Sequence, residues 1–401
     1  MTIEEITLEK AVELICSGVG TLASERVRTP VARGRILAED VAAGMDQPPF
    51  PRSPVDGYAV ISSDTAGASA DNPVSLKVVD RIYCGSAAIT AIHSGSSALI
   101  MTGGMLPEGC DSVIRQEDTD MGWPEVKIYE SSECHENYCE RGEDYKRGEL
   151  LAPHGYKLDA AGIAVCASAG IEALPVLKRP RVAIIATGDE LSGLGTGIEP
   201  GKIYPSSLYY LASRLDELGA DVGMTEIVGD VRQEIEKCLK LAVSASDAVI
   251  TTGGVSVGER DLMYETLDGM NAEVVFHGIS MKPGSPTLFA KLAGTPVLSL
   301  SGNPFAAVSS FELLMRPLLH AMTGDPDLAP MRVSARLATK FKKASHIRRF
   351  IRGIYKDGEV SLPHGHANGV LKSLLGCNCL IDIPEGTGAL EIGSEIPAIL
   401  F

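Results

Sequence analysis

The chain has 401 residues, of which 45% are hydrophobic and 22% are charged, and this composition is typical of a folded globular protein. At about 150 residues per domain, the length predicts two to four domains. The formal net charge of −16 argues against nonspecific binding to nucleic acid or to anionic lipid, because both require a surplus of lysine and arginine.

Secretion and membrane insertion are not expected. The chain begins without a basic segment followed by an apolar one, and it has no uninterrupted apolar stretch of about 18 residues. The nine cysteines are scattered, so we expect reduced thiols and a cytoplasmic location. Cys134, His135 and Cys139 lie close together, but no second cluster with zinc-site spacing accompanies them, and we expect no metal there.

The N-terminal part of the chain predicts one helix and a β-rich module. Residues 7–18 have apolar side chains at helical spacing, with Thr7 as the N-cap. From 25 to 144 the chain consists of short runs rich in Val, Ile, Ser, Gly and Pro, which are typical of short strands and loops. We assign 25–144 to a β-rich module, and 1–24 with 145–175 to a linking helical subdomain.

From residue 181 onward, strands and helices alternate. The strands are expected at 181–187, 221–228 and 247–252, and the helices at 207–218 and 233–245. Repeated strand-helix units imply a mostly parallel sheet that is covered by helices. The expected fold class is therefore α/β with additional β modules, and its centre is a three-layer α/β/α domain over 176–325.

The last part of the chain again has the residue pattern of short β-strands. Two runs rich in β-branched and aromatic residues, 349–355 and 359–362, flank the turn signal Asp357-Gly358, which predicts a hairpin. We expect 326–401 to form a separate, barrel-like β domain.

Three predicted loops could carry chemistry, because ligands of open α/β sheets bind beyond the carboxyl ends of the strands. After the strand 181–187, a glycine permits a tight turn, and Asp189 and Glu190 place two carboxylates where a metal or a ribose could be held. Asp189 could equally do no more than cap the turn.

The loop after 247–252 has the parts of a phosphate cradle. Three glycines let backbone N–H groups approach an anion, Ser256 adds a hydroxyl donor, and a helix begins near Leu262. The pattern is neither GxxxxGK[ST] nor GxGxxG, so the common ATPase and dinucleotide-binding functions are not indicated. A purely structural glycine turn is the alternative.

The third loop, 282–286, is followed by another polar turn at 299–304. Prolines fix the backbone, glycine opens it, and Lys282 supplies a point charge suited to an oxyanion. A lone lysine in a turn is more often a solvated surface group. A functional role for Lys282 is favoured only because two other candidate loops are expected at the same edge of the sheet.

Seven short motifs follow one another along the chain. They lie at 53–59 (SPVDGYA), 101–104 (MTGG), 141–144 (RGED), 187–191 (TGDEL), 252–261 (TGGVSVGERD), 281–284 (MKPG) and 301–304 (SGNP). Together they resemble those of the MoeA family of molybdopterin molybdenumtransferases, which includes the E domain of gephyrin. The resemblance spans nearly the whole chain. It implies a homodimer of elongated four-subdomain subunits that transfers molybdenum from molybdate, or tungsten from tungstate, to adenylylated molybdopterin and releases AMP.

The resemblance also implies roles for individual residues. Asp56 and Thr102 would reach the substrate across the dimer. Glu190, Asp230 and Asp261 would serve the pterin and a magnesium ion, with Glu190 and Asp261 as metal ligands. Carboxylates hold Mg²⁺, which neutralises the charge that builds up on phosphoryl oxygens.

Other residues are implied to bind the substrates. Those for the pterin and its phosphate are Thr187, Gly253, Gly254, Ser256 and Gly258. Those for the oxyanion are Lys282, Arg352, Ser373 and, by position, Ser285.

Departures from the family pattern concern the anion pocket rather than the reaction. Family members commonly have a lysine at the position of Ser285 and an arginine at that of Cys139, and this chain also departs from them at Phe305-Ala306. Arg348 or Arg349, which lie just before Arg352, could supply a compensating charge. Strand alternation puts Arg348 on the same face as Arg352, so Arg348 is the better candidate.

Two other functions are compatible with these patterns. A molybdopterin adenylyltransferase would resemble 180–325 alone, and the long flanking modules argue against it. A scaffold of the same fold, which would bind partners without catalysis, would not need its four carboxylates, those of Asp56, Glu190, Asp230 and Asp261. The expected protein partners are a molybdopterin adenylyltransferase and apo-molybdoenzymes, and we expect binding to neither nucleic acid nor a membrane.

Overall fold

The computed structural model describes residues 5–255, 262–365, 367 and 369–401, and Ser256, Gly258 and Asp261 lie outside them. The chain divides into two compact units. Unit 1 comprises Met1–Glu25, Gly34–Ala38 and Val176–Phe401, and unit 2 comprises Arg26–Arg33 and Glu39–Pro175. None of the helices in the described part of the chain has the length and apolar character needed to cross a bilayer.

Unit 1 is built on a six-stranded sheet with the strand order β11-β10-β12-β15-β14-β13. The strands are β10 (Arg181–Thr187), β11 (Asp221–Val228), β12 (Ala248–Thr252), β13 (Glu273–His277), β14 (Leu288–Leu292) and β15 (Thr295–Leu300). β11, β10, β12 and β15 are parallel, whereas β14 is antiparallel to both of its neighbours. The predicted parallel-rich sheet is confirmed, and the β14–β15 hairpin is an addition to it.

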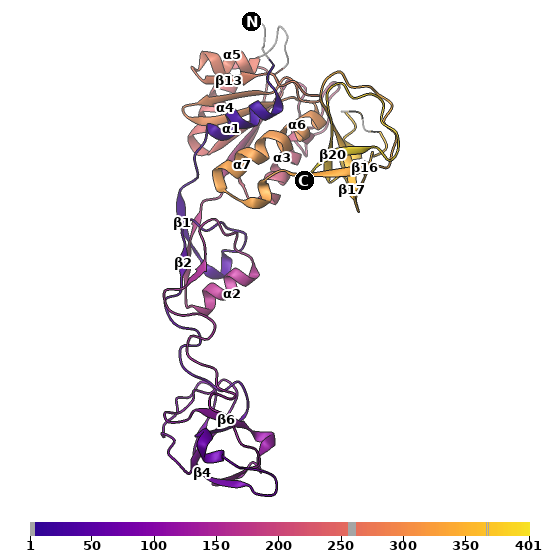
Figure 1. Cartoon of the computed structure of the whole chain (residues 1–401). Coiled ribbons are helices and arrows are strands. Elements are labelled where there is room, and N and C mark those ends of the chain that lie inside the picture. The colour runs from indigo at the N-terminus through magenta and orange to yellow at the C-terminus, as the bar shows by residue number, and fades with distance from the viewer. Residues whose placement is uncertain (1–4, 256–261, 366, 368) are drawn as a thin grey trace. The chain divides into compact units, whose positions relative to one another are not determined.

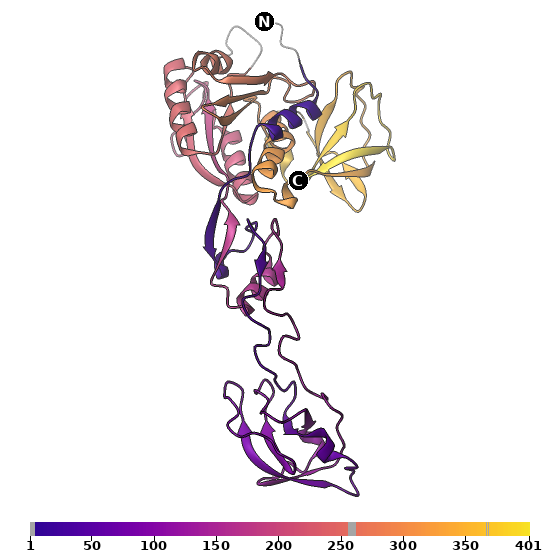
Figure 2. The same ribbon diagram turned by 60° about the vertical axis from the view of Figure 1, so that its left-hand side comes forward.

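Helices cover both faces of this sheet (Figures 1 and 2). They are α1 (Leu8–Ser17), α3 (Ser206–Glu217), α4 (Arg232–Ala245), α5 (Leu262–Gly269), α6 (Pro304–Ser310), the π-helical turn η4 (Phe311–Met315) and α7 (Arg316–Thr323). Alternate residues of β10 face opposite layers. Ile184 lies in the apolar core with α1, α3, α6 and α7, and Ile185 lies in the core with α4 and α5. The three-layer arrangement is therefore as predicted.

The C-terminal strands of unit 1 close into a barrel in the order β16-β18-β17-β19-β20, drawn in orange to yellow in Figure 2. Its elements are β16 (Met331–Leu337), β17 (Arg349–Lys356), β18 (Glu359–Ser361), β19 (Cys379–Ile383) and β20 (Glu395–Leu400), with 3₁₀ turns η5 (Pro326–Leu328) and η6 (Leu371–Leu374). The predicted hairpin joins β17 to β18. Its turn residues Asp357 and Gly358 have φ angles of 50° and 82°, as a tight hairpin turn requires.

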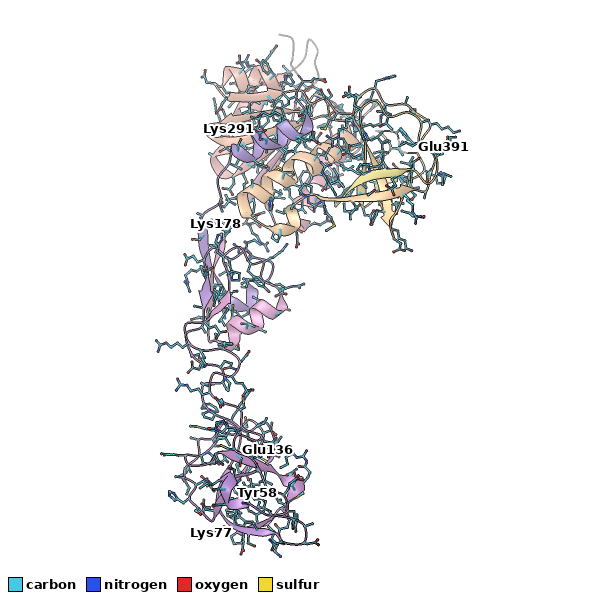
Figure 3. All side chains as sticks on the ribbon, viewed as in Figure 1. Tyr58, Lys77, Glu136, Lys178, Lys291 and Glu391 are labelled. Atoms are coloured by element: carbon cyan, nitrogen blue, oxygen red, sulfur yellow. The ribbon has the colours of Figure 1, made fainter. Side chains whose placement is uncertain are left out.

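Unit 2 contains a five-stranded sheet with the order β6-β3-β5-β4-β7, and β2 pairs with β8. Its elements are η1 (Thr29–Val31), β2 (Val41–Ala42), β3 (Gly57–Val60), η2 (Ser62–Thr65), β4 (Val74–Ile82), β5 (Ser96–Ile100), β6 (Ser112–Arg115), η3 (Gln116–Asp118), β7 (Glu125–Ile128), β8 (Leu150–Ala152) and α2 (Ala160–Ser168). The chain passes between the units at β1 (Ser24–Arg28) and β9 (Ala173–Leu177), which pair with each other. Tyr58, labelled in Figure 3, is 2% exposed and packs in the core of the five-stranded sheet.

Candidate functional site

The predicted loops of unit 1 emerge at one edge of the central sheet, because paired residues form a continuous row across it. Ile185 pairs with Thr251, Thr251 with Ser299, Ser299 with Leu288, and Leu288 with His277. β13 is antiparallel to β14, so it runs in the same direction as the parallel strands. The segments that follow β10, β12, β15 and β13 therefore leave the sheet at the same edge, where ligands of α/β sheets bind.

Acidic side chains join the loops that follow β10 and β11. The backbone N–H of Asp230 donates to the Asp189 carboxylate at 3.0 Å, and the N–H of Asp189 donates to the Asp230 carboxylate at 3.4 Å. The Glu190 carboxylate lies over Gly188, where an added Cβ would come within 2.4 Å of a carboxylate oxygen. All three acidic residues are exposed, so this part of the edge is negatively charged.

Glycines let the neighbouring loops pack closely. Gly253 and Gly254 have φ angles of +94° and +66°, which side-chain-bearing residues rarely adopt. A Cβ on Gly253 would lie 2.3 Å from the carbonyl oxygen of Thr187, and a Cβ on Gly302 would lie 3.4 Å from the Cα of Gly253. The buried Thr187 hydroxyl donates to the carbonyl of Thr252 at 3.3 Å. The structure thus brings together the predicted substrate residues Thr187, Gly253 and Gly254.

Main-chain hydrogen bonds join the Lys282 loop to the barrel. The N–H of Lys282 donates to the carbonyl of Arg348 at 2.9 Å, and the N–H of Phe350 donates to the carbonyl of Lys282 at 2.8 Å. These bonds form a parallel bridge between Lys282 and Arg349. A lysine from the sheet edge and an arginine from the barrel are therefore neighbours.

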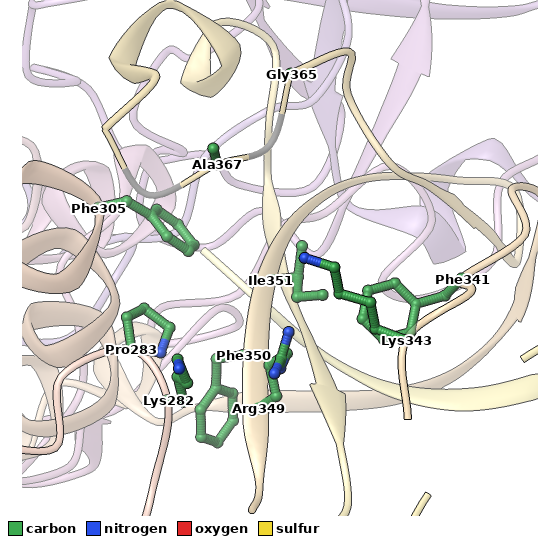
Figure 4. A pocket seen from close by; sticks show the side chains of 10 residues that line it. All are labelled: Lys282, Pro283, Phe305, Phe341, Lys343, Arg349, Phe350, Ile351, Gly365 and Ala367. Atoms are coloured by element: carbon green, nitrogen blue, oxygen red, sulfur yellow. The ribbon is translucent and has the colours of Figure 1, made fainter. Parts of the chain in front are cut away.

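A cavity of about 580 Å³, termed here the cationic cavity, opens where this loop meets the barrel. Figure 4 shows its lining, which consists of Lys282, Pro283, Phe305, Phe341, Lys343, Arg349, Phe350, Ile351, Gly365 and Ala367. Three of these side chains are cationic, and most of the others are aromatic or aliphatic. The cavity therefore combines positive charge with apolar walls, which suits a small anion.

Arg352 and Ser373 support the wall of the cationic cavity. Arg352 is fully buried, and its guanidinium donates to the carbonyls of Ala367 at 2.5 Å and Val370 at 3.3 Å. It also lies 3.8 Å from the ring centroid of Phe305. The Ser373 hydroxyl donates to the same Val370 carbonyl at 2.7 Å. Burial lowers the pKa of Arg352. Arg352 thus holds the lining residues Ala367 and Phe305 from behind, and Ser373 is linked to it only through the shared Val370 carbonyl.

Ser285 and Arg348 have partners away from the cationic cavity. The Ser285 hydroxyl donates to the Glu5 carboxylate at 2.7 Å. The Arg348 guanidinium donates to Asp382 at 2.8 and 2.6 Å and to Glu9 at 2.6 Å, and the hydrogen bonds to Asp382 raise the pKa of Arg348. The structure therefore does not bring Ser285 to the cavity lining, and the charge of Arg348 is compensated.

In unit 2, Asp56 and Thr102 are in direct contact. The N–H and the hydroxyl of Thr102 donate to one Asp56 carboxylate oxygen at 2.6 and 2.8 Å, and these bonds lower the pKa of Asp56. The Ser53 N–H donates to the carbonyl of Gly104, and the Gly103 N–H donates to the carbonyl of Ser53, so the two turns are tied together. A cavity of about 570 Å³ beside them is lined by Arg52, Ser53, Pro54, Thr102, Gly103, His135, Asn137, Tyr138, Cys139 and Glu143.

An α/β sheet with carboxylates at one part of its edge and a cationic cavity at another defines a protein that binds anionic substrates. Comparison with known proteins identifies the family within this class. Residues 6–170 match the MoeA N-terminal region (domain I and II), residues 183–321 match a probable molybdopterin binding domain, and residues 334–401 match the MoeA C-terminal region (domain IV).

Relatives match over the full length of the chain. A molybdopterin molybdenumtransferase from Staphylococcus epidermidis is 33% identical over 399 residues, which cover 98% of this chain and 95% of the relative. One from Staphylococcus aureus strain COL gives the same values. Two crystal structures of a molybdopterin biosynthesis MoeA protein from Pyrococcus horikoshii have TM-scores of 0.87 and 0.81 at 31% and 27% identity, over 99% of this chain and 99% and 100% of theirs. The chain belongs to the MoeA family.

Proposed function

We propose that the chain is a molybdopterin molybdenumtransferase, which transfers molybdenum from molybdate to adenylylated molybdopterin and releases AMP during synthesis of the molybdenum cofactor. The full-length relatives carry the same activity in their names. The structural observation that carries the proposal is that one edge of the sheet in unit 1 carries both an acidic region, after β10 and β11, and a cationic cavity, beside the Lys282 loop. A metal-bound phosphoanhydride and an oxyanion need these opposite environments.

The cationic region is proposed as the oxyanion site. Lys282 lines the cationic cavity, Arg352 fixes its wall at Ala367, and Ser373 shares the carbonyl of Val370 with Arg352. Ser285 contributes indirectly at most, since its hydroxyl is bound to Glu5. The proposed assignment therefore keeps three of the four oxyanion residues expected from the sequence.

The acidic region fits a magnesium ion. Glu190 and Asp230 offer only oxygen ligands, which Mg²⁺ prefers. In sites that bind phosphates, Mg²⁺ takes one or two protein carboxylates and completes its shell with water and substrate phosphates. When bound, the ion would neutralise charge on the phosphoryl oxygens as AMP leaves. Asp261 is proposed as its second ligand from the sequence resemblance alone.

The loop of Gly253 and Gly254 is proposed to hold the terminal phosphate of the pterin. Neither glycine has a side chain that would cover the backbone, and buried Thr187 fixes the position of the loop. The N–H of Gly253 already donates to the carbonyl of Leu300 at 3.0 Å, so the N–H of Gly254 is the proposed donor. Ser256 and Gly258 belong to the same proposal on the sequence motif.

The assembly is proposed to be a homodimer in the cytoplasm. In it Asp56 and Thr102 of one subunit would complete the site of the other, and the Asp56 carboxylate is already oriented by two hydrogen bonds from Thr102. All nine cysteines are free thiols in the structure, which fits a reducing compartment.

The proposal is tested by AMP release from adenylylated molybdopterin and molybdate. Glu190→Ala should lower the rate by about 10²-fold or more, because it removes a charge-stabilising group, while the unfolding midpoint stays unchanged. Glu199→Ala, an exposed residue of the neighbouring loop, is the control. Wild-type-like turnover of Glu190→Ala would contradict the assignment.

Composite sites are tested by mixing. Subunits with Asp56→Ala and subunits with Glu190→Ala should each be inactive, and a mixed dimer should regain up to one working site. Subunits that exchange without any recovery would rule out the shared site. Incubation with unadenylylated molybdopterin and ATP separates the alternative, since adenylylation without metal insertion would identify an adenylyltransferase.

A further inference from the structure

The cationic cavity holds three positive charges that are not compensated within the described structure. Lys282, Lys343 and Arg349 all line it, and Figure 4 shows their nitrogen atoms around the same space. Among the residues that the structure describes, no carboxylate forms a salt bridge with any of the three. Arg348, which precedes Arg349, is by contrast bound by Asp382 and Glu9.

Arg349 has a second feature that suits an anion. Its Nε atom is buried and has no hydrogen-bond partner, and a buried donor without a partner costs free energy. The backbone of Arg349 is fixed by its pairing with Ile383 and its bridge to Lys282. The side chain is therefore held at the cavity while its hydrogen-bonding capacity is unused.

We propose that Arg349 and Lys343 select the charge of the oxyanion, so that the cationic cavity prefers a tetrahedral dianion to a monoanion of the same size. This inference rests on the proposed function. It adds Lys343, which the sequence patterns did not assign to the site, and it selects Arg349 where the sequence favoured Arg348. Lys282 would hold the anion from the sheet edge, while Arg349 and Lys343 hold it from the barrel. Arg352 keeps a different role, since its donors are bound to wall carbonyls.

Coulomb's law gives the expected size of the effect. The interaction energy is proportional to the product of the charges, so loss of one cation costs a dianion twice the free energy that it costs an isosteric monoanion. The fold-loss of affinity for the dianion is then the square of the fold-loss for the monoanion. If a variant weakens a monoanion about threefold, it should weaken the dianion about tenfold.

The test is isothermal titration calorimetry of the full chain with molybdate and with perrhenate, a tetrahedral monoanion of similar size, in the absence of the pterin. The variants are Arg349→Gln and Lys343→Gln. The matched control is Lys342→Gln, because Lys342 is an exposed neighbour that does not line the cavity. Arg349→Lys keeps the charge and should largely restore the preference.

We expect Arg349→Gln and Lys343→Gln each to lower molybdate affinity about tenfold and perrhenate affinity about threefold, with the control unchanged. Equal losses for both anions, or variants that behave as Lys342→Gln does, would overturn the inference while leaving the proposed function intact if the wild-type chain still releases AMP. A wild-type chain that neither binds molybdate nor releases AMP would instead refute the proposed function.

Discussion

Glu312 lies in the π-helical turn η4 and is 1% exposed. Its carboxylate accepts hydrogen bonds from Arg214 Nε at 2.7 Å and Nη2 at 3.4 Å, and it lies 3.9 Å from Nη1 of Arg316. Arg316 donates to the carbonyl of Leu400 at 2.8 Å, and Arg214 lies 5.8 Å from the ring centroid of Phe401. Glu312→Gln would leave two guanidinium groups without their shared countercharge at the junction of the helices and the barrel.

The magnitude follows from burial. The side chains of Arg214 and Arg316 are 15% and 9% exposed, so water screens little of their charge. Removing one partner of such a buried pair costs about 3–5 kcal/mol, because the two guanidinium groups lose their buried countercharge. Glu217 offers a matched control, since it binds the same Arg214 at 2.8 Å but is 62% exposed. Glu217→Gln should change the free energy of unfolding by less than about 1 kcal/mol.

Urea unfolding of the full chain, followed by circular dichroism and by fluorescence, measures both variants. Trp123 is the single tryptophan and lies in unit 2, so its fluorescence monitors that unit. The circular dichroism transition of unit 1 should shift in Glu312→Gln, whereas the fluorescence transition should not. Each transition is fitted separately, because a chain with two units need not unfold in one step. Equal losses in the two variants would refute the argument from burial.

Two further predictions concern the turns. Thr102→Val removes one of the two donors to Asp56, so NMR titration should show the pKa of Asp56 rising toward its unperturbed value of about 3.9; an unchanged pKa would contradict the hydrogen-bond explanation. Because the folded pKa is the lower one, this contact stabilises the fold above about pH 4, and its contribution is lost as the pH falls through the folded pKa. Gly253→Ala combines a φ of +94° with a clash at 2.3 Å, so it should destabilise unit 1 by at least about 1–3 kcal/mol. Gly195→Ala has a similar φ of +85° in open space, and an equal loss there would show that the clash contributes nothing.

The strongly patterned elements could be predicted from the sequence. The expected strand 181–187 is β10 with the same bounds, because nearly all of its side chains are buried and apolar. The antiparallel hairpin β14–β15 was not expected. Its turn residues Ala293 and Gly294 both have positive φ angles, 51° and 86°, but alanine is not a residue that signals such a turn.

The sequence patterns did not predict which cationic side chains of the barrel line the cavity. Lys342 and Lys343 are adjacent cations, as are Arg348 and Arg349. Strand alternation favoured Arg348, but Arg349 is the one that lines the cavity. The choice depends on Asp382, which lies opposite Phe350 in the barrel and compensates Arg348. This partner is 34 residues away in the chain, and no local pattern links the two.

Main-chain hydrogen bonds join the Lys282 loop to β17. We call this junction the seam, and its bonds do not depend on the identity of the side chains that flank them. Mutation can therefore exchange the charged head groups on either side of the seam while the two elements stay joined. Over evolution, the choice of oxyanion can change faster than the architecture that presents it. Related chains that bind an anion of a different charge should differ first at the positions of Lys343 and Arg349, with these main-chain hydrogen bonds retained.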